Sequence, residues 1–258
     1  MLREEYRGRV REAAERAVRG EVRELKKELG RLLEVEDKAA IMEELIRFYD
    51  HRSNNFKFMI KTLQPVMKEY SDKIAQAAKA EYGDVVYGDL ENFINNHLFW
   101  QTRIHAGSGL RQLQNIVALS GPGALLEEMD KRMREWVEGG PTGTTRGERF
   151  ANRQVVQADG AIAREVWRRQ GATKLIWRNS GSENCPICAR LDGMVIGIDE
   201  SFVPAGMQIG IDEIAEIDNE PQHGPHVPIK AGSDIMHPPL HAGCDCRIEV
   251  VIESVLSS

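Results

Sequence analysis

Cysteine and histidine residues form two clusters in the last third of the sequence. The first is Cys185-Pro186-Ile187-Cys188, and the second, more than fifty residues later, is His241-Ala242-Gly243-Cys244-Asp245-Cys246. The chain has four cysteines, and all of them lie in these clusters. A Cys-x-x-Cys pair and a His-x-x-Cys pair together supply the sulfur and nitrogen ligands of a tetrahedral zinc site. The spacing therefore predicts one zinc ion that holds the last third of the chain together.

The two clusters offer five thiol or imidazole groups for the four positions of such a site. The predicted ligands are Cys185, Cys188, His241 and Cys244, with Cys246 as the substitute. Cysteine-rich ligation makes zinc a poor Lewis acid, whereas a catalytic site keeps an open position for water and a nearby base. We therefore expect a structural zinc ion.

Two other uses of the cysteines stay open. Four cysteines can pair as two disulfides in an oxidising compartment, although Met1–Glu5 begins a charged helix and not a secretion signal. A redox-active Cys-x-x-Cys of the thioredoxin type lies between a strand and a helix. Here residues 191–194 form a turn that leads into a strand. Both observations favour zinc in an intracellular protein.

Other imidazole and carboxylate groups lie near the clusters. His223, His226 and His237 indicate either a second metal or nuclease-like pocket, or a proline-rich loop with solvent-facing polar residues, which we favour. Residues 199–220 contain seven acidic residues and no basic one. We expect the carboxylates between Asp212 and Asp218 to be solvated or to contact a basic partner, because carboxylates outside a glycine-centred loop bind cations weakly.

Motifs of several enzyme classes are absent from the sequence. It has no His-x-Glu of a nucleotide deaminase, no glycine-rich phosphate loop and no Gly-x-Ser-x-Gly nucleophile elbow. Two prolines lie between His237 and His241, so this pair does not lie on one helix as in a metalloprotease. The sequence therefore predicts a protein that is not an enzyme.

Composition narrows the class of protein further. Of 258 residues, 41% are hydrophobic and 29% charged, with a net charge of -6 and a mean hydropathy of -0.41. We expect a soluble protein with no membrane segment, no small-molecule substrate and no general attraction to nucleic acid. A local basic run near Gly171 allows local contact with DNA, or complements a helix end. This run consists of Arg164, Arg168, Arg169, Lys174 and Arg178.

Residues 1–36 predict a long charged helix, in which opposite charges recur four positions apart. Its apolar seam repeats at alternating intervals of four and three residues, as in a coiled coil. The seam consists of Val18, Val22, Leu25, Leu29 and Leu32. In an isolated chain we expect this helix to fold onto its own domain. In an assembly we expect an arm that buries the seam against another subunit.

Helical periodicity and turn residues predict six further helices. They cover residues 37–63, 66–80, 89–104, 110–119, 124–137 and 146–170. The breaks between them include Pro65, Gly107-Ser108-Gly109 and Ser120-Gly121-Pro122-Gly123. Asp37 and Thr145 are predicted N-caps. Gly160 predicts close packing within the last helix, and Gly171 ends that helix.

The pattern beyond Gly171 predicts strands at 174–178, 194–198 and 247–252. The predicted fold class is α+β, with a predominantly helical N-terminal body and a small antiparallel β module held by zinc. The glycine-rich stretch 139–144 separates two predicted domains. Residues 1–140 form the helical arm and body, and residues 145–258 form the module with the zinc site.

Three motifs in the second domain occur in an order seen in one protein family. They are Ser182-Glu183-Asn184-Cys185-Pro186-Ile187-Cys188, Leu191-Asp192-Gly193, and Pro238-Pro239-Leu240-His241-Ala242-Gly243-Cys244-Asp245-Cys246-Arg247. From about Thr145 to Ile252 the chain resembles the phage Mu F-like minor head proteins, a group of head-morphogenesis proteins of tailed bacteriophages. It departs from them at Asp245, where arginine is common. Asn152-Arg153-Gln154 also stands where that family often has a Thr-Glu pair.

The resemblance implies a low-copy virion protein that is made in the host cytoplasm and acts in head morphogenesis. Its implied partners are the portal protein, the major capsid protein or both, with a possible influence on the retention or exit of packaged DNA. Two alternatives stay open: a zinc-dependent hydrolase or nuclease that acts during packaging, and a DNA-binding accessory factor. The first needs an open metal position, and the second needs affinity that falls steeply with salt.

Overall fold

The computed structural model describes residues 2–82, 90–179, 186–209, 229–241 and 243–251. The chain forms two compact units, and we call them the helical unit and the cysteine unit. The helical unit comprises Met1–Tyr70 and Asp89–Asn152, and the cysteine unit comprises Ser71–Gly88 and Arg153–Ser258. The helices and the small antiparallel sheet confirm the α+β fold class.

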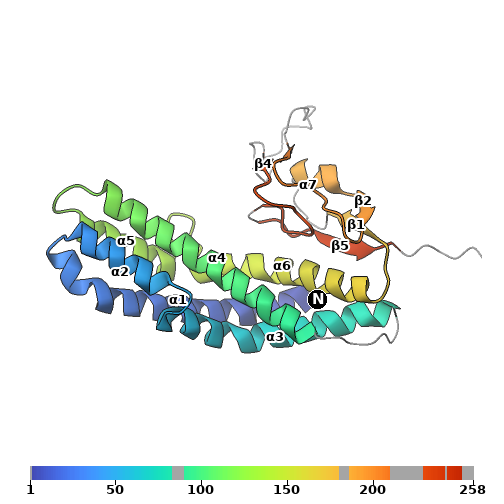
Figure 1. Cartoon of the computed structure of the whole chain (residues 1–258), viewed down its shortest axis with the longest axis horizontal. Helices are drawn as coiled ribbons and strands as arrows, with labels where there is room; N and C mark the ends of the chain where they lie inside the picture. Colours follow the sequence, from blue (N-terminus) through green and yellow to red (C-terminus); the bar gives the residue numbers. More distant parts are fainter. Residues whose placement is uncertain (1, 83–89, 180–185, 210–228, 242, 252–258) are drawn as a thin grey trace, which may run out of the picture. The chain divides into compact units, whose positions relative to one another are not determined.

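Six helices contribute to the helical unit. They are α1 (Leu2–Glu34), α2 (Lys38–Tyr49), α3 (Asn54–Tyr82), α4 (Leu90–Leu119), α5 (Leu125–Glu138) and α6 (Arg146–Arg169), of which α3 and α6 also supply residues to the cysteine unit. The helices α1, α2, α4 and α5 lie lengthwise beside one another (Figure 1). Each of these four contacts two of the others, in the cyclic order α1, α2, α4, α5. This is the arrangement of a four-helix bundle.

The apolar seam of α1 forms part of the core of this bundle. Leu25 and Leu29 are fully buried, and Val18 and Val22 are nearly so. They pack in one cluster with residues of α2, α4 and α5, including Trp136. The expectation that the helix folds onto its own domain is confirmed. The expectation that this seam becomes buried on assembly is wrong, because the other helices of the unit already cover it.

Two predicted helix boundaries are wrong. The predicted helix 37–63 is two helices, because a turn at Asp50–Ser53 separates α2 from α3. Pro65 lies inside α3 and does not end it. Its missing N–H removes one hydrogen bond of the helix. The neighbouring Leu63 and Met67 are buried, so packing of the apolar face holds α3 together across the proline.

The predicted break at Gly107-Ser108-Gly109 is also absent, because α4 continues through it. A Cβ atom at Gly109 would lie 2.8 Å from Nη1 of Arg146 and 2.9 Å from the hydroxyl of Tyr49. Glycine is therefore required here for the close approach of other side chains. The break at Ser120–Gly123, by contrast, is confirmed between α4 and α5.

A buried ion pair joins α1 and α6 within the helical unit. The side chains of Glu21 and Arg146 are 0% and 5% exposed. Oε1 of Glu21 accepts hydrogen bonds of 2.6 Å from Nη1 of Arg146 and 2.6 Å from the hydroxyl of Tyr49. Nη2 of Arg146 donates to the carbonyl of His105 at 2.8 Å, and the guanidinium lies 4.0 Å from the ring centre of Trp136. Each buried charge therefore has an opposite charge and hydrogen-bond partners.

The predicted N-caps are confirmed. The carboxylate of Asp37 accepts from the backbone of Ala40 at 3.0 Å, and the hydroxyl of Thr145 accepts from that of Glu148 at 3.0 Å. Gly171 follows α6 with a φ of 84°, a left-handed conformation that suits glycine.

Short strands form the sheet of the cysteine unit. Its elements after α6 are β1 (Lys174–Arg178), α7 (Pro186–Leu191), β2 (Val195–Gly197), β3 (Gln208–Ile209), β4 (Ile229–Lys230) and β5 (Arg247–Val250). The strands β2, β1 and β5 form an antiparallel sheet in that order, and β3 pairs with β4. All three predicted strands are confirmed. The helix α7 and the two-residue strands were not predicted, since such short elements have no measurable periodicity.

Gly160 of α6 packs against the loop that precedes the second cysteine cluster. A Cβ atom there would lie 2.9 Å from Cβ of His237. Arg164, one turn further on, donates to the carbonyl of Met236 and, at 2.7 Å, to that of Glu200. The predicted close packing at Gly160 is confirmed. In the described part of the chain, no helix has the length and apolar character needed to cross a membrane.

Candidate metal centre

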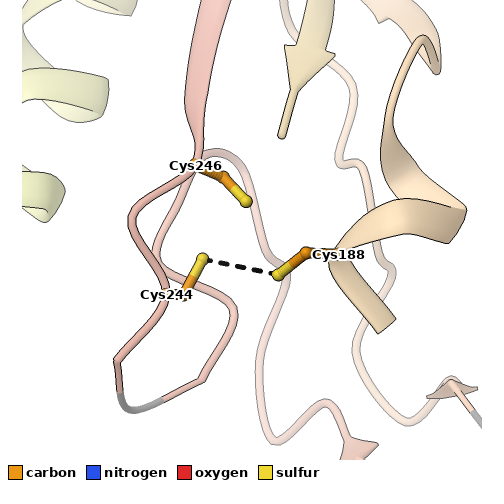
Figure 2. A group of neighbouring side chains, drawn as sticks. All are labelled: Cys188, Cys244 and Cys246. Carbon is orange, nitrogen blue, oxygen red and sulfur yellow. Dashed lines mark hydrogen bonds between the residues drawn. The ribbon is translucent and has the colours of Figure 1, made fainter. Parts of the chain in front are cut away.

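Strand pairing brings the two cysteine clusters together. The register of β1 and β5 sets Arg178 opposite Arg247, so the residues just before β5 lie beside the end of β1. Cys244 and Cys246 precede β5, and Cys188 lies in α7, which follows β1 along the chain. Figure 2 shows the three side chains turned toward one another. Their ligand atoms all lie within 4.8 Å of one another.

The three cysteines are part of the core of the cysteine unit. Cys188, Cys244 and Cys246 are 1%, 6% and 2% exposed. The sulfur atoms of Cys188 and Cys244 are 3.8 Å apart, and no disulfide bond joins any of the described cysteines. A cation at this position would be shielded from water.

His241 lies beside this group. Its Nε2 atom is 3.1 Å from the sulfur of Cys188, and its carbonyl accepts from the backbone of Cys244 at 3.2 Å. The structure thus brings together four of the five predicted ligands, and Cys246 belongs to the same group of sulfurs as Cys188 and Cys244. Cys185 lies outside the described residues. Whether each residue binds a metal stays a prediction.

The protonation of the thiols reflects their crowding. Hydrogen bonds from Cys188 and Cys246 lower the pKa of Cys244 far below its ordinary value. The hydrogen bond to Cys244, together with burial, raises the pKa of Cys188. The crowding of three sulfurs therefore opposes the ionisation of all of them at once. A divalent cation among them would allow all three to ionise.

Trp177 of β1 and Asn179, which directly follows that strand, adjoin the cluster, and we had not predicted them as site residues. The sulfur of Cys246 lies 3.8 Å from Oδ1 of Asn179, and Trp177 lies on the same face of the sheet as Cys246. The signal was present in the sequence. Alternation along a strand places Trp177 and Asn179 on one face. Only the register with β5 shows that this face meets the cysteines.

The other candidate residues do not join the cysteine cluster. His223, His226 and the acidic residues Asp212, Glu213, Glu216 and Asp218 lie outside the described residues. His237 is partly buried against α6, and its surroundings lower its pKa to about 4, chiefly through loss of hydration. The predicted solvent-facing loop is therefore wrong for this histidine.

Most of the basic run has protein partners. Arg168 and Arg169 both donate to Glu165 of the preceding turn, and Arg178 donates to Glu249 of β5. Arg164 holds two backbone carbonyls of the cysteine unit. These arginines have structural contacts, and contact with DNA stays a prediction.

Comparisons with known proteins add no information about the site. No family model matches the chain, no curated protein matches it, and no solved structure matches it.

Proposed function

We propose that the cysteine unit binds one zinc ion with a structural role. Cys188, Cys244 and Cys246 are the proposed ligands, with His241 or Cys185 as the fourth. The observation that carries the proposal is the burial of three thiols within one ligand sphere. When bound, the ion would supply the positive charge that three thiolates require.

The spacing of the sulfurs supports zinc. Thiolates bound ~2.3 Å from zinc at tetrahedral corners lie ~3.8 Å apart, and the sulfurs of Cys188 and Cys244 are 3.8 Å apart. Soft thiolate ligands select zinc, copper(I) or iron–sulfur clusters, and a nearby imidazole favours zinc among these.

Burial supports a structural role. All three sulfurs belong to residues with almost no exposed surface. A hydrolase or nuclease needs a coordination position that water and substrate can reach. Four protein ligands around the ion would leave no such position.

Metal analysis of the purified protein tests this function. We expect about one zinc per wild-type chain, a large loss in Cys188→Ser, and full retention in Ser233→Ala, which changes an exposed residue of the same unit. Cys185→Ser and His241→Asn identify the fourth ligand. A metal-free wild type would refute the proposal. A cobalt derivative whose spectrum requires a bound water would favour the hydrolase instead.

We also propose that the whole protein is a minor head protein of a tailed bacteriophage. It would reside in the virion and contact the portal or the major capsid protein. The support is the motif order between residues 145 and 252, together with a buried three-cysteine cluster where those motifs place a metal. The helical unit is compatible with an assembly role that requires no catalytic site.

Co-sedimentation tests the assembly role. The chain is co-expressed with the portal and major capsid proteins of the same genome, and head-sized particles are isolated. We expect the wild type in the particle fraction and less of Cys188→Ser there. A wild-type chain that stays in the soluble fraction in the presence of both proteins would exclude this role. Affinity for duplex DNA that falls steeply with salt would favour the accessory-factor alternative.

A further inference from the structure

The sheet register directs Trp177 toward the cysteine cluster. Trp177 pairs with Ile248, and continuing the register places Asn179 opposite Cys246. Residues two apart on a strand share a face, so Trp177 and Asn179 lie on the face that carries Cys246 and Ile248. The 3.8 Å contact between Asn179 and the sulfur of Cys246 agrees with this register.

The indole of Trp177 carries a buried donor with no hydrogen-bond partner among the described residues. The side chain is 0% exposed, and its ring packs against Phe202 at a centroid distance of 5.1 Å. Among the described residues, its Nε1–H has no partner that meets hydrogen-bond geometry. Buried donors without an acceptor are rare and costly, so this group requires an explanation.

Cys246 is the acceptor that the surroundings offer. Trp177 lies opposite Ile248, and Cys246 is its diagonal neighbour on the same face, at a separation that a large aromatic side chain can span. A thiolate is a much better acceptor than a thiol, because a charged acceptor strengthens a hydrogen bond. The indole therefore lies on the face of the sheet that carries the sulfur that would become negative.

We propose that the indole N–H of Trp177 donates to the metal-bound thiolate of Cys246. Cys246 is then a full ligand and not a substitute, and Trp177 is a positioning residue that orients this ligand and withdraws charge from its sulfur. Groups that hydrogen-bond to metal ligands orient them and tune the metal in this way. The inference rests on the proposed metal centre.

The proposed bond has a chemical consequence. A thiolate that accepts a hydrogen bond has less charge available for attack on an electrophile. Cys246 should therefore react slowly with iodoacetamide, which forms a sulfur–carbon bond and releases iodide. Removing the N–H donor while keeping an aromatic ring should expose this reactivity without emptying the core.

NMR of the wild-type protein loaded with a spin-active cadmium isotope tests the bond directly. We expect one indole proton to show scalar coupling to cadmium through the hydrogen bond, and that signal to be absent from Trp177→Phe. Cadmium that binds without coupling to the Trp177 indole would overturn the inference and leave the metal centre intact. Failure to bind cadmium or zinc would instead refute the proposed function, and this inference with it.

Alkylation of the zinc-loaded protein gives a second readout. We expect Cys246 to react several-fold faster in Trp177→Phe than in the wild type, as measured by mass spectrometry of its peptide. The control is Trp136→Phe, which removes an indole that donates to Gln112 in the helical unit. Equal rates at Cys246 in wild type and Trp177→Phe, with zinc retained in both, would contradict the proposal.

Discussion

The two units accommodate buried polar groups in different ways. The helical unit buries Glu21 against Arg146, so the chain itself supplies both charges of the pair. The cysteine unit buries three thiols that lie close enough together to hold a metal ion. The helical unit therefore supplies both charges of its buried pair, whereas the charge of a metal bound in the cysteine unit would come from outside the chain.

The two units also differ in how much apolar surface stabilises them. The helical unit contains α1, of 33 residues, and α4, of 30 residues, which bury continuous apolar faces. The strands of the cysteine unit have two to five residues, and so small a sheet buries little apolar surface. With the proposed zinc ion, one chain would combine a self-sufficient core with one that depends on a ligand.

Loss of the proposed metal should have the largest effect and should destabilise the cysteine unit while leaving the helical unit intact. Structural zinc contributes ~10–16 kcal/mol in zinc-finger peptides, about as much as the whole stability of a typical domain. In Cys188→Ser we expect β1, β2 and β5 to lose protection from hydrogen exchange while α1 and α2 keep theirs. Hydrogen-exchange mass spectrometry resolves the two sets of peptides. Retained protection of the sheet in a metal-free protein would show that the cysteine unit is self-sufficient too.

Breaking the buried ion pair should weaken the helical unit next most strongly. Arg146→Met leaves Glu21 buried without a positive charge, a change that costs ~3–5 kcal/mol in other proteins. The double variant Glu21→Leu/Arg146→Met removes both charges and should recover most of that loss. Urea unfolding followed by circular dichroism measures the difference. The control Arg9→Met breaks the solvent-exposed pair with Glu69 and should change stability little.

The buried pair of Glu21 and Arg146 should also make the stability of the protein depend on pH in the acid range. Burial alone would raise the pKa of Glu21, but Arg146 and hydrogen bonds from His105 and Tyr49 lower it from 4.5 to about 2. A lowered folded-state pKa stabilises the protein above the unfolded value, and this contribution is lost as pH falls from 4.5 towards 2. We expect the wild type to lose more stability across this window than the double variant. Parallel curves of unfolding free energy against pH would contradict this.

Two glycine substitutions give the smallest expected effects, of opposite sign. Gly160→Ala places a Cβ atom 2.9 Å from His237, and overpacking of this kind costs ~1–3 kcal/mol. Gly30→Ala meets nothing within 4 Å in α1 and should add about 0.5–1 kcal/mol through helix propensity. Thermal unfolding of both variants checks the signs. Stabilisation by Gly160→Ala would mean that the loop of His237 does not pack on α6.

Local signals in the sequence predicted most of the fold. The charge pairs and apolar seam predicted α1, and the capping box predicted the start of α6. The residues Lys174–Arg178 predicted β1 within its observed bounds. These elements are specified by neighbouring residues, which a single sequence displays.

The failures involve contacts between distant residues. Gly109 was predicted to break a helix. The structure shows that glycine is needed there because Arg146, far along the chain, occupies the space beside it. Pro65 was predicted to end a helix, but packing of the apolar face of α3 keeps the helix continuous. For the site, spacing selected Cys188, His241 and Cys244, but the place of Cys246 in the same group and the role of Trp177 depend on the register of β1 and β5.

The contacts of Arg164 and Gly160 with the loop around His237 have a consequence for chain entropy. A metal that joins Cys188 to His241 would close a stretch of ~50 residues, and the pairing of Val203 with Ile235 and the contacts of Arg164 already shorten the part left to order. Arg164 holds the carbonyl of Met236, so only the short segment from there to His241 remains to be ordered when the site closes. Closing a segment of a few residues in place of the long loop saves ~2 kcal/mol. An arginine that touches no proposed ligand would thereby raise the affinity of the centre for the proposed metal.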